Sequence, residues 1–254
     1  MQSKSKRAVF IRIAAAVFLV AVTLTFLGET TFDVVREITY HTTIPMIQSM
    51  FKGKLSANGV LQLLNAVIPF IGFVIDSVLS FITVIMLFAL KEKVAGKLFI
   101  ISAVINILFY IAGLVIYLIL ISNTPALSSF ISANIWPAVS YLFIQTLMIL
   151  LGLLLLGAFK GATKVFGFIL VGLFSVCIIY DLVSFIGGIP SGINALVNAG
   201  KNTAFNVISA LYNYFLNIPI LIMTYTGCII CSLGVALTSK KEKVGEVTDG
   251  GQQA

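Results

Sequence analysis

Two carboxylates lie inside apolar runs of the chain. Asp76 occurs in IGFVIDSVLSF and Asp181 in CIIYDLVSF. An ionised aspartate at the centre of a membrane helix costs about 2.5–3.5 kcal/mol on insertion scales, so such residues usually face a bundle interior or a wet cavity. We hypothesise that Asp76 and Asp181 line one outward-facing polar site that binds a cation or a proton. Alternatively, each is protonated or satisfied by neighbours one turn away: Ser77 and Ser80 for Asp76, Tyr180 and Ser184 for Asp181.

Two amides complete the candidate intramembrane site. Asn106 and Gln145 also lie within long apolar runs. Hydrogen bonds between helices account for many such residues and contribute about 0.6 kcal/mol each on average. The two amides are therefore candidates for the polar site, with a purely structural role as the alternative.

Metal and cofactor chemistry is not expected. His41 is the single histidine, and one histidine among scattered carboxylates is weak evidence for a metal site. A solvated helix end explains its surroundings better than a metal site does. These charged neighbours are Glu29, Asp33, Arg36 and Glu37. The sequence also lacks a phosphate loop, an HExxH motif and a Gly-x-Ser-x-Gly motif, so we predict a protein that is not an enzyme.

The three cysteines indicate packing rather than redox chemistry. Cys177, Cys228 and Cys231 all lie in apolar runs, and an odd number without an extracellular pair argues against a disulfide framework. Small residues let membrane helices approach closely. One such face is predicted from Thr224, Gly227, Cys228, Cys231, Ser232 and Gly234. Gly157 and Gly161 form a GxxxG pattern to which we give the same role.

Composition identifies the elements that must position these residues. The chain has 254 residues, of which 59% are hydrophobic and 10% charged, and its mean hydropathy is +1.11. Soluble domains are usually about 25% charged. The net charge of +7 does not indicate nucleic-acid binding, because the basic residues stand at the ends of apolar runs and only 3 of 16 are arginine. We predict an all-α polytopic integral membrane protein with the lipid bilayer as its surroundings.

Six apolar stretches are long enough to cross a bilayer, which takes about 20 helical residues. The predicted spans are 8–28, 66–90, 98–121, 136–159, 165–187 and 216–238, within a single domain over 1–238. Residues 239–254 are predicted to be a short polar cytoplasmic tail. Arg12 interrupts the first span and basic residues precede it, as in a cleaved signal peptide. We favour an uncleaved helix, with a five-helix mature chain as the alternative.

Charge asymmetry predicts the orientation. With the N-terminus inside, the cytoplasmic segments hold 12 of the 16 basic residues and the outer segments hold 4. Positive residues gather on the cytoplasmic side of membrane proteins. Both termini are therefore predicted to be cytoplasmic, in a protein of the cell membrane.

The outer segments are predicted to contain short amphipathic helices. Ser56 is expected to cap a helix over 57–65 that runs into the second span. A second short helix is expected from Pro45, with Ile44, Ile47 and Phe51 on one face, and a third over 203–218, capped by Asn202 or Thr203. Three aromatic residues suit a membrane–water interface. These are Trp136 at the start of the fourth span, Tyr212 and Tyr214.

The spans also suggest an internal repeat. Each even span begins near an asparagine and a proline and ends at lysines followed by a basic, glycine-containing turn. The chain is therefore compatible with three tandem helical hairpins. The prolines involved are Pro69, Pro137 and Pro219. The alternative is that any six-helix protein shows lysine at inner ends and proline at helix starts.

Two functional classes follow. The first is a non-catalytic accessory, scaffold or assembly subunit, whose partners are other membrane protein subunits or a second copy of the chain. The second is a small transporter or channel with an outward-facing site near Asp76 and Asp181, which takes an ion or a small molecule. Convergence of the four polar candidates on a wet cavity would favour the second class.

Overall fold

A computed structural model describes residues 2–40, 48–49, 52, 56–122, 126–199 and 204–239. Every element within these residues is helical. The elements are α1 (Gln2–Tyr40), α3 (Ala57–Phe88), α4 (Glu92–Ile121), α5 (Ala126–Leu156), α6 (Thr163–Ala199), α7 (Ala204–Leu211), a π-helical turn η1 (Tyr212–Leu216) and α8 (Asn217–Thr238). Six helices are long and apolar enough to cross a membrane, which confirms the predicted all-α, six-span fold class.

The first two spans extend beyond the apolar stretches that predicted them. α1 runs without a break past Arg12, whose side chain is exposed. α3 begins directly after Ser56, and the backbone N–H of Gly59 donates to Ser56 Oγ at 3.2 Å. This bond satisfies one of the free N–H groups at a helix start, so the predicted cap and its continuous helix are confirmed.

The prediction that prolines mark the starts of even spans is wrong for two of the three helices. Pro69 lies inside α3 and Pro137 inside α5, which begins at Ala126. Trp136 consequently lies within α5 rather than at its start. Membrane helices tolerate internal proline because neighbouring helices, serine and threonine side chains and local helix adjustments satisfy the backbone groups that proline leaves free.

The predicted helix over 203–218 is present, but it is joined to the sixth span. α7, η1 and α8 follow one another without a gap from Ala204 to Thr238. Other predictions fall outside the described residues. They are the short helix from Pro45 with its face residues, the caps Asn202 and Thr203, and the tail from Lys240 onward.

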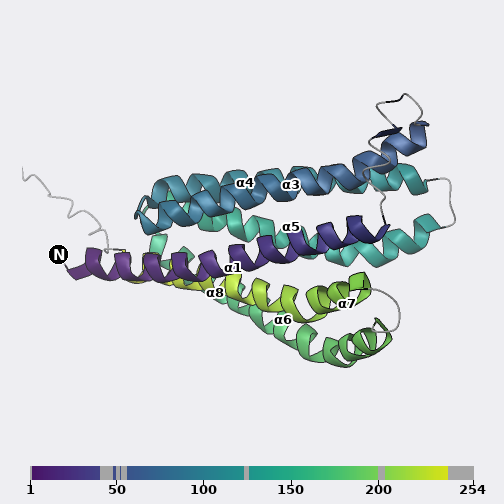
Figure 1. Ribbon diagram of the computed structural model, residues 1–254. Helices are drawn as coiled ribbons and strands as arrows, with labels where there is room; N and C mark the ends of the chain where they lie inside the picture. The colour runs from purple at the N-terminus through teal and green to yellow at the C-terminus, as the bar shows by residue number, and fades with distance from the viewer. Residues whose placement is uncertain are drawn as a thin grey trace, which may run out of the picture.

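The helices pack in the spatial order α5, α4, α3, α1, α8, α6. α4 packs on both α3 and α5, α8 packs on both α1 and α6, and α1 joins the two groups through α3. Figure 1 shows these two groups of three, with α6 bending away from α5 toward α7. α5 meets α6 and α8 over only short stretches. The six helices therefore form a ring that is closed weakly along one side.

The apolar core lies toward one end of this ring. We call it the basic end, because Lys6, Lys91 and Lys160 stand at the helix termini there. Its core includes the fully buried Ile11, Leu87, Leu151, Phe174 and Val235. The remaining stretch of the bundle, away from these lysines, we call the distal half.

Small residues let the helices touch at the basic end. Gly96 of α4 faces Gly152 of α5 so closely that a Cβ added to either would lie 2.6 Å from the other's carbonyl oxygen. On α8, Gly227 packs on Phe18 and Gly234 on Phe10. The predicted packing face of α8 is therefore confirmed at its buried members, which are Gly227, Cys228, Cys231, Ser232 and Gly234. All three cysteines are free thiols.

The packing role predicted for Gly157 and Gly161 is wrong. Both have positive φ, +76° and +77°, and both lie in the turn that joins α5 to α6. Gly157 N–H donates to Leu154 O at 3.1 Å and Ala158 N–H to Leu153 O at 3.0 Å. This pair of bonds is a Schellman motif, which places glycine in the left-handed conformation just after a helix. Gly157 is thus required by the turn and not by a neighbouring helix.

Candidate functional site

A cavity of about 240 Å³ lies inside the ring. Side chains from α1, α3, α4, α5 and α8 line it, whereas α6 contributes none. Among the residues that form it are the polar Thr25, Ser77, Ser80, Thr83, Ser102 and Thr224, and the aromatic Phe18, Phe73, Phe99 and Tyr225. The cavity is therefore a mixed polar and aromatic space at the junction of the core and the distal half.

Asp76 lines this cavity from α3, and its carboxylate is held by α4. Oδ1 accepts a hydrogen bond from Asn106 Nδ2 at 2.8 Å and a second from Ser102 Oγ. The expectation that Ser77 and Ser80 satisfy Asp76 is therefore wrong, because the donors come from the neighbouring helix. Hydrogen bonds to an ionised acceptor are about twice as strong as neutral ones. They fix the position of Oδ1 at the cavity wall.

Asn106 links Asp76 to Tyr141, and Gln145 lines the same cavity. Asn106 donates through its side chain to Asp76, and its backbone carbonyl accepts from Tyr141 OH at 3.4 Å. Gln145 lines the cavity one turn after Tyr141 on α5. The network therefore connects three helices, α3, α4 and α5. Asn106 also forms a hydrogen bond between helices, as its purely structural role would require.

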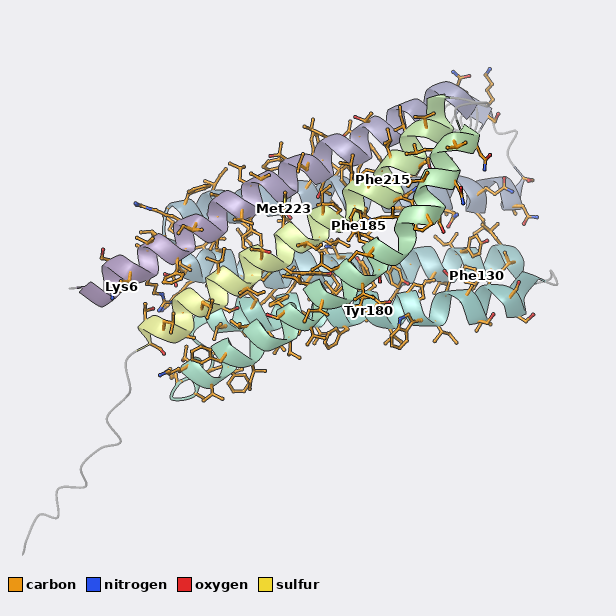
Figure 2. The ribbon with its side chains drawn as sticks, turned by 90° about the horizontal axis from the view of Figure 1, so that it is seen from below. Lys6, Phe130, Tyr180, Phe185, Phe215 and Met223 are labelled. Atoms are coloured by element: carbon orange, nitrogen blue, oxygen red, sulfur yellow. The ribbon has the colours of Figure 1, made fainter. Side chains whose placement is uncertain are left out.

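Asp181 lies elsewhere. It is absent from the cavity lining, and its Oδ2 is buried without a hydrogen-bond partner among the described residues. Tyr180 was expected to satisfy Asp181, but its hydroxyl instead accepts a hydrogen bond from Trp136 Nε1 of α5 at 3.4 Å. Figure 2 shows Tyr180 on the side of α6 that faces α5. The structure thus brings together Asp76, Asn106 and Gln145 and separates Asp181 from them.

The electrostatic character of the cavity is negative and rich in acceptors. Asp76 is the one charged side chain among the described residues that line it. The hydroxyls of Thr25, Thr83 and Thr224 donate to carbonyls one turn back on their own helices, at 2.9, 2.7 and 3.0 Å. Their oxygen lone pairs remain available, since a hydroxyl has one donor and two acceptor positions. The lining can therefore accept hydrogen bonds from a bound donor.

Several site residues escaped the sequence reasoning. Ser102 precedes Asn106 by four residues, and Thr83 follows Asp76 by seven, so each pair shares one helix face. This spacing was a usable signal. The aromatic lining carried no signal of its own, because the chain has 20 phenylalanines.

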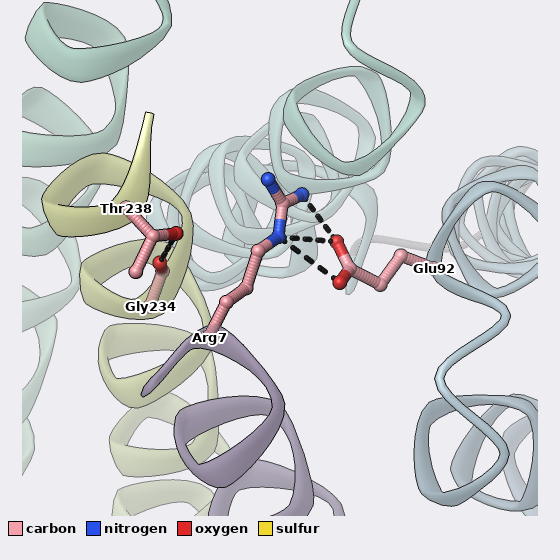
Figure 3. A network of polar contacts seen from close by, with 4 residues as sticks. All are labelled: Arg7, Glu92, Gly234 and Thr238. Atoms are coloured by element: carbon pink, nitrogen blue, oxygen red, sulfur yellow. Dashed lines mark hydrogen bonds and ion pairs between the residues drawn. The ribbon is translucent and has the colours of Figure 1, made fainter. Parts of the chain in front are cut away.

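An ion pair closes the basic end. Arg7 Nε of α1 donates to both carboxylate oxygens of Glu92, at 3.0 and 2.9 Å, and Arg7 Nη2 also bonds to Oε2 (Figure 3). Glu92 lies in the first turn of α4, where the helix dipole favours a negative charge. The two side chains are 32% and 17% exposed. The pair therefore ties α1 to α4 on the side of the core opposite to the distal half.

The charged cluster that follows the first span is described only in part. Tyr212 OH donates to Glu29 Oε1 at 2.5 Å, which links η1 to α1. The side chains of Asp33, Arg36 and Glu37 and all of His41 lie outside the described residues. Within the described part of the chain, no group of three metal-ligating side chains occurs.

Comparison of the chain with family models, curated proteins and solved structures finds no match.

Proposed function

We propose that the protein is a small membrane transporter that binds a cationic solute in the cavity, with Asp76 as the binding carboxylate. The observation that carries this proposal is that, among the described residues, Asp76 is the one charged side chain of the lining. A lone carboxylate in a cavity formed by five apolar helices is costly to keep there, and such residues mark substrate and ion pathways. A bound cation would offset this cost.

The packing of the bundle supports the same proposal. The apolar core and the Arg7–Glu92 pair separate the cavity from the basic end. Along another side of the ring, α5 meets α6 and α8 over only short stretches. A site closed on one side and loosely covered on the other is what alternating access requires. With both termini cytoplasmic in the cell membrane, as we propose, the cavity belongs to an outward-facing state.

The accessory-subunit class remains a second prediction. A partner subunit would need an exposed apolar face such as that on α6, where Val176, Ile179 and Val183 are 63%, 61% and 66% exposed. A bilayer covers such a face without any protein partner, so this observation does not favour either class. Native purification with identification of co-purifying membrane proteins tests it directly.

The deciding experiment is reconstitution into liposomes with a panel of charged solutes. Wild-type protein, Asp76→Asn and the matched control Asp181→Asn are compared by solute-induced current and by solute-induced thermal stabilisation. We expect at least one cation to give both responses in wild type and in Asp181→Asn. In Asp76→Asn its affinity should fall by about tenfold or more, which corresponds to about 1.4 kcal/mol. A response that survives in Asp76→Asn, or its absence for every cation, contradicts the proposal.

A further inference from the structure

We infer that the solute is a small organic ammonium ion, held between the Asp76 carboxylate and the aromatic rings of the cavity. This inference rests on the proposed function and names its substrate class. The cavity has two kinds of wall, and each fits one part of such an ion.

The first wall is the carboxylate. Both of the bonds that hold Asp76, from Ser102 and from Asn106, fall on Oδ1. Oδ2 lies on the same side chain at the cavity wall, and an ionised carboxylate has about four acceptor positions. A cation can therefore pair with Asp76 without displacing the two donors from α4.

The second wall is aromatic. Phe18 of α1 and Phe99 of α4 line the cavity with ring centroids 5.6 Å apart, and Phe73 adds a ring from α3, on which Phe26 stacks at 6.2 Å. Tyr225 of α8 also borders the cavity, but it is 1% exposed and stacks on Phe174 at 6.1 Å. Ring faces attract ammonium groups, and recognition of quaternary ammonium by aromatic side chains is the best known use of this contact.

Other ligand classes fit the lining less well. No lysine, arginine or histidine lines the cavity among the described residues, so an anion would have no partner. Small metal ions prefer a complete shell of oxygen ligands at short distance, to which aromatic rings contribute nothing. The volume of about 240 Å³ far exceeds that of one bare ion, but is below the range usual for drug-sized ligands. A compact alkylammonium ion can both pair with the Asp76 carboxylate and contact the aromatic rings.

The test measures thermal stabilisation of the full chain in lipid nanodiscs. The probes are tetramethylammonium, choline, its neutral analogue 3,3-dimethyl-1-butanol, and sodium chloride at matched ionic strength. We expect the two ammonium ions to raise the unfolding temperature and the neutral alcohol and sodium to leave it unchanged. Affinity for choline should fall by about tenfold or more in Asp76→Asn.

Substitution of the rings measures how much the aromatic side chains contribute to choline binding. We expect Phe99→Leu to weaken choline binding by about threefold to tenfold, with Phe73→Leu as the second variant if the first does not fold. The control is Phe143→Leu, an exposed ring on α5 outside the cavity, which should bind as wild type does.

Three results overturn the inference. Equal stabilisation by the neutral alcohol shows that shape alone is recognised. Binding of sodium alone, lost in Asp76→Asn, removes the ammonium class but leaves the proposed function standing. Ammonium binding that is unaffected by Asp76→Asn removes both the inference and the proposed function.

Discussion

The two halves of the bundle are built by different means. Toward the basic end, Ile11, Leu151 and Phe174 are fully buried and the helices meet through close contacts. In the distal half, the buried side chains are fewer and less completely covered, with Leu63, Ala210 and Tyr212 at 6%, 6% and 7% exposed. The cavity lies where these two arrangements meet. Packing closes the half toward the basic end, whereas the distal half leaves room for a polar site.

The glycines show why this difference arises. In lipid, apolar side chains gain little by leaving their surroundings, so membrane helices associate through close packing and hydrogen bonds. Gly96, Gly152 and Gly167 at the basic end each face a neighbouring helix within van der Waals reach. Farther along the bundle, the Cβ added at Gly28, Gly72 or Gly192 would meet an aromatic side chain, and one added at Gly113 or Gly187 would meet nothing within 4 Å. Close approach between helix backbones is therefore concentrated at the basic end.

Gly152→Ala should have the largest effect, because it disrupts the helix packing toward the basic end. The new Cβ would meet the backbone of α4, which cannot move as a flexible side chain does. We expect a loss of about 2–3 kcal/mol in the free energy of unfolding, the upper range for overpacking. Reversible unfolding in mild detergent measures it.

The control for this change is Gly113→Ala in the open surroundings of α4. Because alanine favours helix over glycine, the variant should be unchanged or more stable, by up to about 1 kcal/mol. Equal destabilisation of both variants would show that the proposed difference between the halves does not exist.

Breaking the Arg7–Glu92 pair should have the next largest effect. Glu92→Gln removes a charge from a pair that is 17–32% exposed, so solvent screening reduces the loss to about 1–2 kcal/mol. A double-mutant cycle with Arg7→Gln isolates the coupling between the two residues. Arg12→Gln, which alters an exposed arginine on the same helix, should change stability little. A coupling near zero would mean that the pair does not help to close the basic end.

Replacing each of the two membrane aspartates by leucine should change the free energy of unfolding in opposite directions. Asp181 has a buried oxygen without a partner among the described residues, so Asp181→Leu should stabilise the protein by about 1 kcal/mol. Asp76→Leu leaves Ser102 and Asn106 without their acceptor and should destabilise it by about 1–2 kcal/mol. Both are measured by unfolding in the same detergent. Effects of the same sign would show that the two sites do not differ as the structure indicates.

The smallest expected effect concerns a turn within the closed half. Leu90 has φ of +56° in the turn between α3 and α4, where the bonds Leu90 N–H to Leu87 O and Lys91 N–H to Met86 O repeat the Schellman pattern of Gly157. We expect Leu90→Gly to stabilise the protein by about 0.5–1 kcal/mol, because glycine adopts this conformation without strain.

Its control is Ala89→Gly next to it. Ala89 has φ of −74°, so glycine brings no relief there and only raises the entropy of the unfolded chain. Stabilisation of both variants, or of neither, would show that the left-handed conformation of Leu90 is not strained. The unfolding temperature provides the comparison.

Much of the fold could be predicted because its determinants are local. Hydropathy over about 20 residues gives each span, and the cap at Ser56 depends on one side chain and a backbone N–H three residues later. The buried face of α8 follows from the spacing of its small residues. Helix limits were harder to predict, since α5 begins ahead of Trp136 and Pro137.

The sequence by itself determined the six helices, their polar residues and the small-residue face of α8, because composition and helical spacing act within a single helix. Only the tertiary structure decided which of these residues meet. Asp76 finds its donors 26 and 30 residues away on α4, Arg7 pairs across 85 residues with Glu92, and Asp181 stays apart. The physical reason is that the rotation of each helix about its axis depends on the sum of many weak contacts with its neighbours, which no single segment contains.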